Sequence, residues 1–306
     1  MGRIDEALRR SNLDAAQGTG AEAPEPAASP WSIDLPEDRG EVGRDVNLPV
    51  SQEPDGAAFE PSVPREVRRP VRWGGFNAGT TERLVVSKNS GPMLVEQFRG
   101  LAAALLQAQG ERHLKSIIVT SPSPGDGKSH VAVNLALTLS ESYRRRVLLV
   151  DADLRRPTLH ALFRMPNSAG LSELLKTETD GKAAGIEVSQ TLRVLPAGGP
   201  EASPLGGLSS ARMKRIVASA ATRFDWVIVD SPPVGILADA RLVSETVDAA
   251  LLVVRAAVTR FQDLEAAIGT LGPEHILGVV LNAVDPLEIR SEGYYKYYSG
   301  SESQER

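Results

Sequence analysis

Lys128 and Ser129 are the residues whose types and setting most clearly indicate chemistry. They close the loop SPSPGDGKS, residues 121–129, which also contains Gly125 and Gly127. An apolar run at 117–120 predicts a buried strand before the loop, and apolar residues every four positions predict a helix after it. The N-terminus of such a helix offers unpaired N–H groups and partial positive charge to a phosphate. The segment therefore predicts a phosphate site.

The expected ligand is a nucleoside triphosphate with magnesium. Lys128 would reach the outer phosphates, and the Ser129 hydroxyl would ligate the cation. The loop departs from the P-loop pattern at Pro122, where a glycine is expected; proline fixes φ and lacks an N–H, so the first turn must differ. The predicted nucleotide contacts come from the consecutive residues Gly125, Asp126, Gly127, Lys128, Ser129 and His130. The alternative is an ordinary strand-to-helix turn with an exposed lysine.

Carboxylates follow two further apolar runs. Asp151 and Asp153 come after 147–150, and Asp230 comes after 226–229. Residues two apart on an extended chain share a face, and open α/β sheets bind ligands at the carboxyl ends of their strands. We therefore expect Ser129, Asp153 and Asp230 to hold magnesium, directly or through water. Each aspartate has an alternative as a helix cap or turn former.

Three other polar residues follow predicted strands. Arg155 and Arg156 either complement phosphate charge or lie exposed. Asn282 ends the last predicted strand, where its amide either pairs with a nucleotide base or forms a turn.

Four of the five tyrosines lie within five residues near the C-terminus: Tyr294, Tyr295, Tyr297 and Tyr298. Their neighbours are small, polar or charged, which does not fit a core strand. Phosphorylation would add roughly −1.5 to −2 charge to each. We interpret the cluster as phosphate acceptors; the alternative is an aromatic surface for a partner.

Composition limits the classes of function. The net charge of −5 gives no reason to expect nucleic acid as a partner. The absence of cysteine excludes disulfides, and with only four histidines a zinc site is not expected. No apolar run approaches the ~18–20 residues of a membrane helix, and no secretory signal opens the chain. A cytoplasmic protein is expected.

Three segments of the chain differ in amino-acid composition and in predicted order. Residues 1–80 are rich in Pro, Gly, Ala and Glu, with nine prolines between Pro24 and Pro70, and predict disorder, apart from a short amphipathic helix at 2–11. Residues 84–288 predict the globular domain. Residues 289–306 predict a flexible tyrosine-rich tail.

Strand and helix patterns alternate through the globular part. Apolar runs predict strands at 117–120, 147–150, 192–195, 226–229, 250–254 and 277–281, and helices are predicted at 93–107, 129–142, 208–222, 237–246 and 260–271. Continuous apolar runs are typical of strands buried on both faces. The order predicts an α/β fold: a P-loop NTPase with a mostly parallel central sheet between two helical layers, a three-layer sandwich.

Taken together, the motifs resemble the bacterial tyrosine autokinase (BY-kinase) family of capsule and exopolysaccharide biosynthesis. The similarity runs from about Glu82 to Ser299 and includes SPSPGDGKS, VLLVDADLRRP, VIVDSPPV and GYYKYY. The opening MGRIDEALRR is similar to the branch encoded at exopolysaccharide/PEP-CTERM-type loci. The resemblance implies ATP- and Mg²⁺-dependent autophosphorylation of the tyrosine cluster in trans, with Lys128, Asp151 and Asp153 as catalytic residues. Asp151 would accept or orient the phenolic proton.

The resemblance also implies partners. It indicates a homo-oligomer in which a tail reaches a neighbouring subunit, activated by a separate inner-membrane polysaccharide chain-length regulator; the enzyme would then be peripheral to that membrane. Two departures stand out. Glu96 and Arg99 fit the family's Glu-x-x-Arg-x-x-Arg helix motif, but Ala102 replaces the second arginine. His130 replaces a small hydroxyl residue.

Two rival functions remain. The first is a partitioning-type P-loop ATPase switch, whose members usually carry an additional lysine early in the loop; residues 121–126 contain none. The second is a non-catalytic nucleotide-binding regulator of a polysaccharide export complex.

Overall fold

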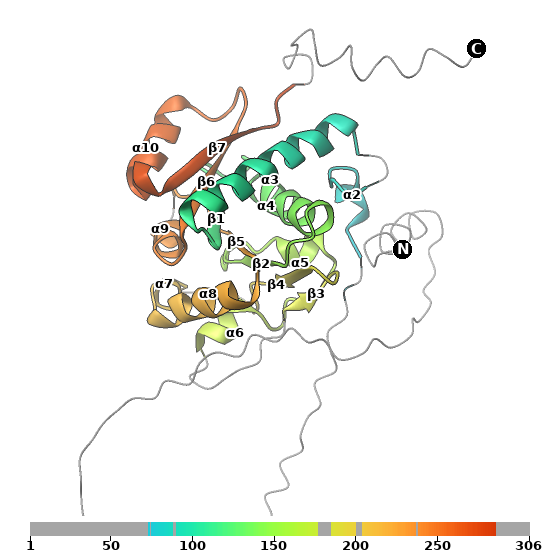
Figure 1. The fold of residues 1–306 in the computed structure, drawn as a ribbon. Coiled ribbons are helices and arrows are strands. Elements are labelled where there is room, and N and C mark those ends of the chain that lie inside the picture. Colours follow the sequence, from blue (N-terminus) through green and yellow to red (C-terminus); the bar gives the residue numbers. More distant parts are fainter. Residues whose placement is uncertain are drawn as a thin grey trace, which may run out of the picture.

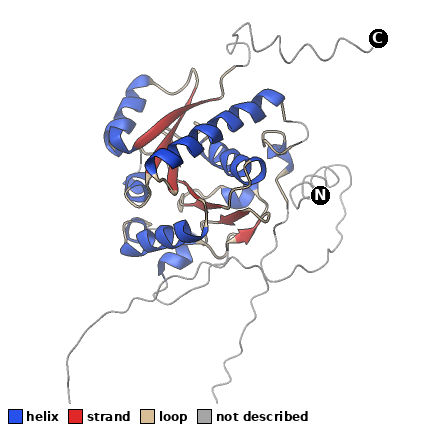
Figure 2. Ribbon diagram, in the orientation of Figure 1, coloured by secondary structure: helices blue, strands red, loops and turns tan. Residues whose placement is uncertain are grey.

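The fold was described from a computed structural model, which places residues 73, 75–87, 90–176, 185–199, 204–236 and 238–285. A single sheet lies between two groups of helices (Figures 1 and 2). The N-terminal helix expected at 2–11 and the tyrosine cluster lie outside the described residues, so both stay predictions.

The sheet has seven strands in the order β3-β4-β2-β5-β1-β6-β7. Their bounds are β1 Ser116–Thr120, β2 Val147–Asp151, β3 Ile186–Glu187, β4 Leu192–Leu195, β5 Trp226–Asp230, β6 Ala249–Arg255 and β7 Ile276–Asn282. All neighbouring pairs are parallel except β3 with β4. The predicted three-layer α/β sandwich with a mostly parallel sheet is confirmed.

The helices lie between the strands along the chain. They are α2 Ala78–Thr81, α3 Pro92–Arg112, α4 Lys128–Leu137, α5 Leu159–Leu162, α6 Leu171–Lys176, α7 Leu205–Leu208, α8 Ala211–Arg223, α9 Ala238–Ser244 and α10 Phe261–Leu271. A π-turn, η1 Thr138–Ser142, extends α4, and a 3-10 turn, η2 Pro273–His275, precedes β7. The sequence did not predict helices α2, α5, α6 and α7 or strand β3, because pieces of two to six residues show no clear periodicity.

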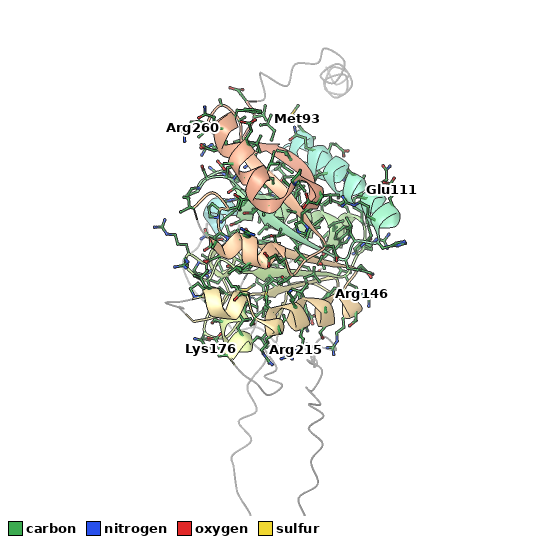
Figure 3. The ribbon with its side chains drawn as sticks, turned by 90° about the vertical axis from the view of Figure 1, so that its left-hand side faces the viewer. Met93, Glu111, Arg146, Lys176, Arg215 and Arg260 are labelled. Atoms are coloured by element: carbon green, nitrogen blue, oxygen red, sulfur yellow. The ribbon has the colours of Figure 1, made fainter. Side chains whose placement is uncertain are left out.

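Two cores occupy the two faces of the sheet. One packs α3, α4 and α5 against the sheet; the other packs α6, α8, α9 and α10. Figure 3 shows Lys176 and Arg215 with the lower helices α6 and α8, away from Met93 on α3 and Arg260 beside α10. Burial on both faces explains the continuous apolar runs of the central strands.

The packed part of the chain begins earlier than predicted. Phe76 is fully buried in the first core, with its ring 5.1 Å from that of Trp73 and 5.3 Å from that of Phe163. The side-chain amide of Asn134 on α4 accepts from Val85 N at 2.9 Å and donates to Arg83 O at 3.0 Å. Packed residues are therefore found before residue 84, where the globular domain was predicted to begin, because two aromatic rings outweigh the polar composition around them.

Among the described residues, no helix is both long enough and apolar enough to cross a membrane.

Candidate nucleotide and magnesium site

The predicted site residues gather at the carboxyl edge of the three central strands. Strand β5 lies between β2 and β1, with Asp230 in register with Asp151 on one side and Val119 on the other. The loop that follows β1 and leads into α4 shares this edge. Because the strands are parallel, residues 79 positions apart in the sequence, Asp151 and Asp230, become neighbours here.

The phosphate loop has the backbone that its glycines predict. Gly125 has φ +87° and Gly127 has φ +95°, conformations that strain any residue with a Cβ. A Cβ on Gly127 would lie 2.0 Å from Asn282 Nδ2. Helix α4 begins immediately afterwards at Lys128. The first N–H groups of the helix have no intrahelical partner and can receive phosphate oxygens.

The first turn of the loop is fastened to the segment that follows β5. Val234 N donates to Ser121 O at 2.9 Å, and the Thr120 hydroxyl donates to Pro232 O at 2.8 Å. A Cβ on Gly235 would lie 2.4 Å from Pro122 O, so the two backbones touch. This contact occupies the position where the usual pattern has glycine.

The side chain of Asp126 supports the loop from within. Its carboxylate accepts from Ser123 N at 2.9 Å and from the Thr259 hydroxyl at 2.8 Å. Asn282 Nδ2 donates to the backbone carbonyl of Asp126 at 2.8 Å. The Asp126 side chain therefore faces protein, and its N–H is the group left for a nucleotide. Asn282 braces the loop; its predicted contact with a nucleotide base stays a prediction.

Lys128, Ser129 and Asp153 form a compact polar group. Lys128 Nζ lies 3.3 Å from Asp153 Oδ2 and 3.5 Å from Ser129 Oγ. The Lys128 and Asp153 side chains are 13% and 7% exposed. Ser129 Oγ also accepts a hydrogen bond from the Thr158 hydroxyl at 3.1 Å. A charge pair this close to open helix N–H groups places Lys128 where it can exchange its carboxylate for phosphate oxygens.

Asp151 is fully buried and satisfied by backbone. Its Oδ2 accepts from Thr158 N and Leu159 N, each at 3.0 Å, and its Oδ1 accepts from Asp153 N at 3.2 Å. Burial, followed by the neighbouring Asp230 charge, raises the pKa of Asp151 to about 8, although the Leu159 and Thr158 N–H groups oppose the rise. The side chain thus holds the start of α5 and the backbone of Asp153.

Asp230 is equally buried, yet neither of its carboxylate oxygens makes a hydrogen bond of normal geometry within the described residues. Burial raises its pKa to about 6. Lys128 is the strongest influence against this rise, with smaller ones from the nearby Ser129 hydroxyl and Ser231 N–H. A buried carboxylate without a partner is costly, and a divalent cation is the partner that would remove that cost.

The remaining donors fit magnesium and not a bare metal cage. Among the described residues, no three His, Asp or Glu side chains converge to hold a metal by themselves. Magnesium normally keeps waters and takes one or two carboxylates with phosphate oxygens. Ser129, Asp153 and Asp230 beside a phosphate loop match that requirement.

Three other predicted residues have distinct environments. Arg155 pairs with the buried Asp239 at 2.7 Å, so it serves the fold on that side of the edge. Arg156 has an exposed side chain, and its N–H donates to Asp153 Oδ1 at 3.0 Å. His130 sits in the first turn of α4 with a half-buried ring, and burial with the nearby Arg83 lowers its pKa. Its imidazole is therefore neutral, and only its backbone favours an anion.

Two threonines were missed by the sequence reasoning. Thr158 contacts Ser129, and Thr259 contacts Asp126. Both sit just before short or ordinary helices, where a threonine reads as a routine cap. No spacing links them to the phosphate loop, since they lie 29 and 133 residues from their partners.

Comparison with known proteins agrees with this geometry. The CobQ/CobB/MinD/ParA nucleotide binding domain family matches residues 117–296, more than half of the chain. Tyrosine-protein kinase YwqD of Bacillus subtilis is 34% identical over 203 residues, which cover 65% of this chain and 85% of that protein. Tyrosine-protein kinase wzc of Salmonella typhimurium is 27% identical and matches 87% of this chain but 38% of its own length.

Solved structures give the same result. The kinase domain of the Escherichia coli tyrosine kinase ETK is 31% identical with a TM-score of 0.59, covering 62% of this chain and 76% of that chain. The chimerical protein CapA2B2 is 30% identical with a TM-score of 0.60, covering 65% and 88%.

Fold and site define a P-loop nucleotide-binding protein of the CobQ/CobB/MinD/ParA type. Within that class, the chain belongs to the family of bacterial tyrosine-protein kinases. The partitioning-ATPase alternative is less supported, because YwqD and the ETK kinase domain, both above 30% identity, are named as tyrosine kinases.

Proposed function

We propose that this protein transfers the γ-phosphoryl group of ATP to tyrosines of its own C-terminal cluster. One observation carries the proposal: the buried Asp230 lies beside Lys128 and Ser129 at the edge of the sheet, and within the described residues its carboxylate makes no hydrogen bond of normal geometry. The chain also belongs to the tyrosine-kinase family. That combination supplies both a place for magnesium triphosphate and a chemical precedent. The acceptors would be Tyr294, Tyr295, Tyr297 and Tyr298 of a neighbouring subunit.

The nucleotide would be held chiefly by backbone. The N–H groups from Gly125 to His130 would receive phosphate oxygens, and Lys128 would turn from Asp153 to the β- and γ-phosphates. Asn282 keeps the loop in shape through Asp126 and lies close enough to the loop for a base contact. ATP is the expected nucleotide.

Magnesium would be held by Ser129, Asp153 and Asp230, directly or through water. When bound, the cation neutralises charge that develops on the transferring phosphoryl group. The protein's part is to keep these oxygens in place and dry: Asp153 and Asp230 are both buried.

Asp151 acts by positioning. Within the described residues, its carboxylate accepts hydrogen bonds from backbone N–H groups, and the side chain is fully buried. Orienting the site therefore suits it better than direct contact with an incoming phenol. Phosphoryl transfer depends mostly on positioning and charge stabilisation. Asp153, at the mouth of the same group, is then the carboxylate best placed to take the phenolic proton.

The proposed reaction balances without another reactant. The phenolic oxygen forms a bond to the γ-phosphorus as the bond from that phosphorus to the β–γ bridging oxygen breaks. ADP leaves with the electron pair, and the phenolic proton passes to the carboxylate or to water.

Partners follow from the tail and from the family. Phosphorylation in trans requires a homo-oligomer. Glu96 and Arg99 form an exposed ion pair at 2.6 Å on α3, whereas Ala102 is fully buried in the first core. The missing arginine is therefore replaced by a core residue, and the subunit contact would be built from other groups. No nucleic acid is proposed as a partner.

A membrane partner completes the proposal. We expect a separate inner-membrane chain-length regulator to activate the enzyme, which would act in the cytoplasm at that membrane in exopolysaccharide or capsule polymerisation and export. The solved protein CapA2B2, which is 30% identical to this chain and is described as chimerical, supports the expectation of a partner.

The deciding experiment compares phosphotyrosine with free phosphate after incubation with Mg-ATP and the activator. Wild type should gain phosphate within residues 294–298, mapped by mass spectrometry. Lys128→Met should lose at least about 100-fold in rate, the usual order for removing one preorganised charge. Lys115→Met, exposed at the opposite end of β1, is its control.

The tyrosines offer a second matched pair. Replacing all four tail tyrosines by phenylalanine should abolish modification and leave ATP binding intact. Tyr143→Phe should change nothing, because its hydroxyl only donates to Arg99 O at 3.0 Å. Phosphate release without phosphotyrosine would support the ATPase switch, and nucleotide binding without either product would support the non-catalytic regulator.

A further inference from the structure

Thr158 occupies the N-cap position of α5 but does not cap it. Its side chain makes no capping hydrogen bond, with φ −125° and ψ −28°. The Asp151 carboxylate performs that task by accepting from Thr158 N and Leu159 N. The hydroxyl of an N-cap threonine usually accepts a hydrogen bond from a backbone N–H in the first turn of the helix. Here the hydroxyl is released and donates to Ser129 Oγ at 3.1 Å instead.

The short helix that carries Thr158 is fixed at both ends. Asp151 holds its first N–H groups, and Asn77 N donates to Leu162 O at 3.0 Å after the last turn. Leu159 and Phe163 are fully buried in the core. The Thr158 hydroxyl therefore has little freedom to leave Ser129, although 29 residues separate them in sequence.

We propose that Thr158 is a positioning residue that orders the Ser129 hydroxyl for magnesium. A serine hydroxyl has two lone pairs and one proton. Thr158 donates to one lone pair, and Lys128 Nζ donates to the other over a longer distance of 3.5 Å. When Lys128 turns to the phosphates, that second lone pair becomes available to a cation while Thr158 keeps the proton directed elsewhere. Without that donor, the hydroxyl is free to rotate among several partners, including Lys128 Nζ and the neighbouring carboxylates.

The consequence is specific to the metal. The phosphate grip rests on backbone N–H groups and Lys128, which Thr158 does not touch. Loss of its hydroxyl should weaken magnesium without weakening metal-free nucleotide. The inference rests on the proposed nucleotide site but does not require kinase activity.

The test measures binding of a fluorescent ADP analogue to the full chain while MgCl₂ is titrated, and again in EDTA. Thr158→Val and Thr158→Ala remove the hydroxyl and keep the backbone N–H that contacts Asp151. Thr158→Ser restores the donor. Thr191→Val is the control, because the Thr191 hydroxyl donates to Ser140 O at 3.2 Å and the residue lies immediately before β4, at the end of that strand opposite the site.

The half-saturating magnesium concentration should rise about 2- to 10-fold in the Val and Ala variants, the range expected for one hydrogen bond. The Ser variant and the Thr191 control should match wild type, and affinity in EDTA should be the same for all. Wild-type magnesium dependence in both hydroxyl-free variants would overturn the proposal. An equal loss with and without magnesium would also overturn it, as a general structural role. If wild type binds nucleotide but forms no phosphotyrosine, the proposed kinase activity is refuted, whereas the proposed role of Thr158 is not affected.

Discussion

Two buried aspartates in adjacent strands behave in opposite ways. Asp151 ends β2 and Asp230 ends β5, and the two are paired in register. Asp151 accepts three backbone N–H groups, whereas Asp230 has no hydrogen bond of normal geometry within the described residues. Both carboxyl groups have raised pKa values, for the same first reason, burial.

The difference distinguishes a structural role, that of Asp151, from a ligand-binding role, that of Asp230. A carboxylate that satisfies backbone builds the local structure and keeps its place without a ligand. A buried carboxylate without hydrogen-bond partners raises the free energy of the folded protein, and a bound ligand can remove that cost. The same sheet edge thus holds one aspartate that fixes the local backbone and one whose carboxylate can bind a cation.

The largest expected effect is on the cation. Asp230→Ala should weaken magnesium-dependent nucleotide binding on the order of 10- to 100-fold, the loss typical of groups that hold or orient a metal. Binding in EDTA should hardly change. Magnesium titration with a fluorescent ADP analogue measures both, and an unaltered magnesium dependence would remove Asp230 from the metal site.

The second expected effect is on the stability of the fold. Asp151→Ala leaves three N–H groups without their acceptor, so the free energy of unfolding should fall by about 2 kcal/mol or more. Asp230→Ala discards a desolvated carboxylate and should leave the nucleotide-free protein as stable as wild type or more so. Urea denaturation at pH 7 without metal compares the two; equal destabilisation would contradict the division of roles.

The smallest effect is a pH dependence. The folded-state pKa of Asp230, about 6, lies above its unfolded value of about 3.9. The folded protein therefore binds more protons between these values, and Asp230 lowers stability as pH rises from about 4 to 6. Asp230→Ala should gain melting temperature relative to wild type over that range in EDTA. The difference cancels His130, which does not influence Asp230. It also includes the lower pKa that Asp151 gains when the Asp230 charge is removed, and this change acts in the same direction. A constant difference would contradict the raised pKa of Asp230.

Much of the fold could be predicted from sequence because buried parallel strands are written as continuous apolar runs. The six runs correspond to six strands within about one residue at either end. Strand β3 and helices α5 and α7 could not be predicted, since two to four residues carry no period. The burial of Phe76 was missed because Phe163, one of the two rings that it packs against, lies on a distant segment of the chain.

The site shows the same division. Glycines at 125 and 127 predicted the loop, since only their backbone freedom suits it. The strand ends predicted three aspartates at one edge, but all three looked alike in sequence. Which one is satisfied depends on where α5 begins, and that is set by packing around Phe163 and Leu159.

By itself, the sequence determined the layered α/β fold, the phosphate loop and the presence of acidic groups at the strand ends, because local periodicity and glycine placement encode them. The tertiary structure alone decided that Asn282 and Thr259 brace the loop and that Thr158 reaches Ser129. It also decided that, among the described residues, Asp230 and not Asp151 lacks a hydrogen bond of normal geometry. These outcomes depend on contacts between segments 29 to 156 residues apart, and no local pattern records where such segments meet.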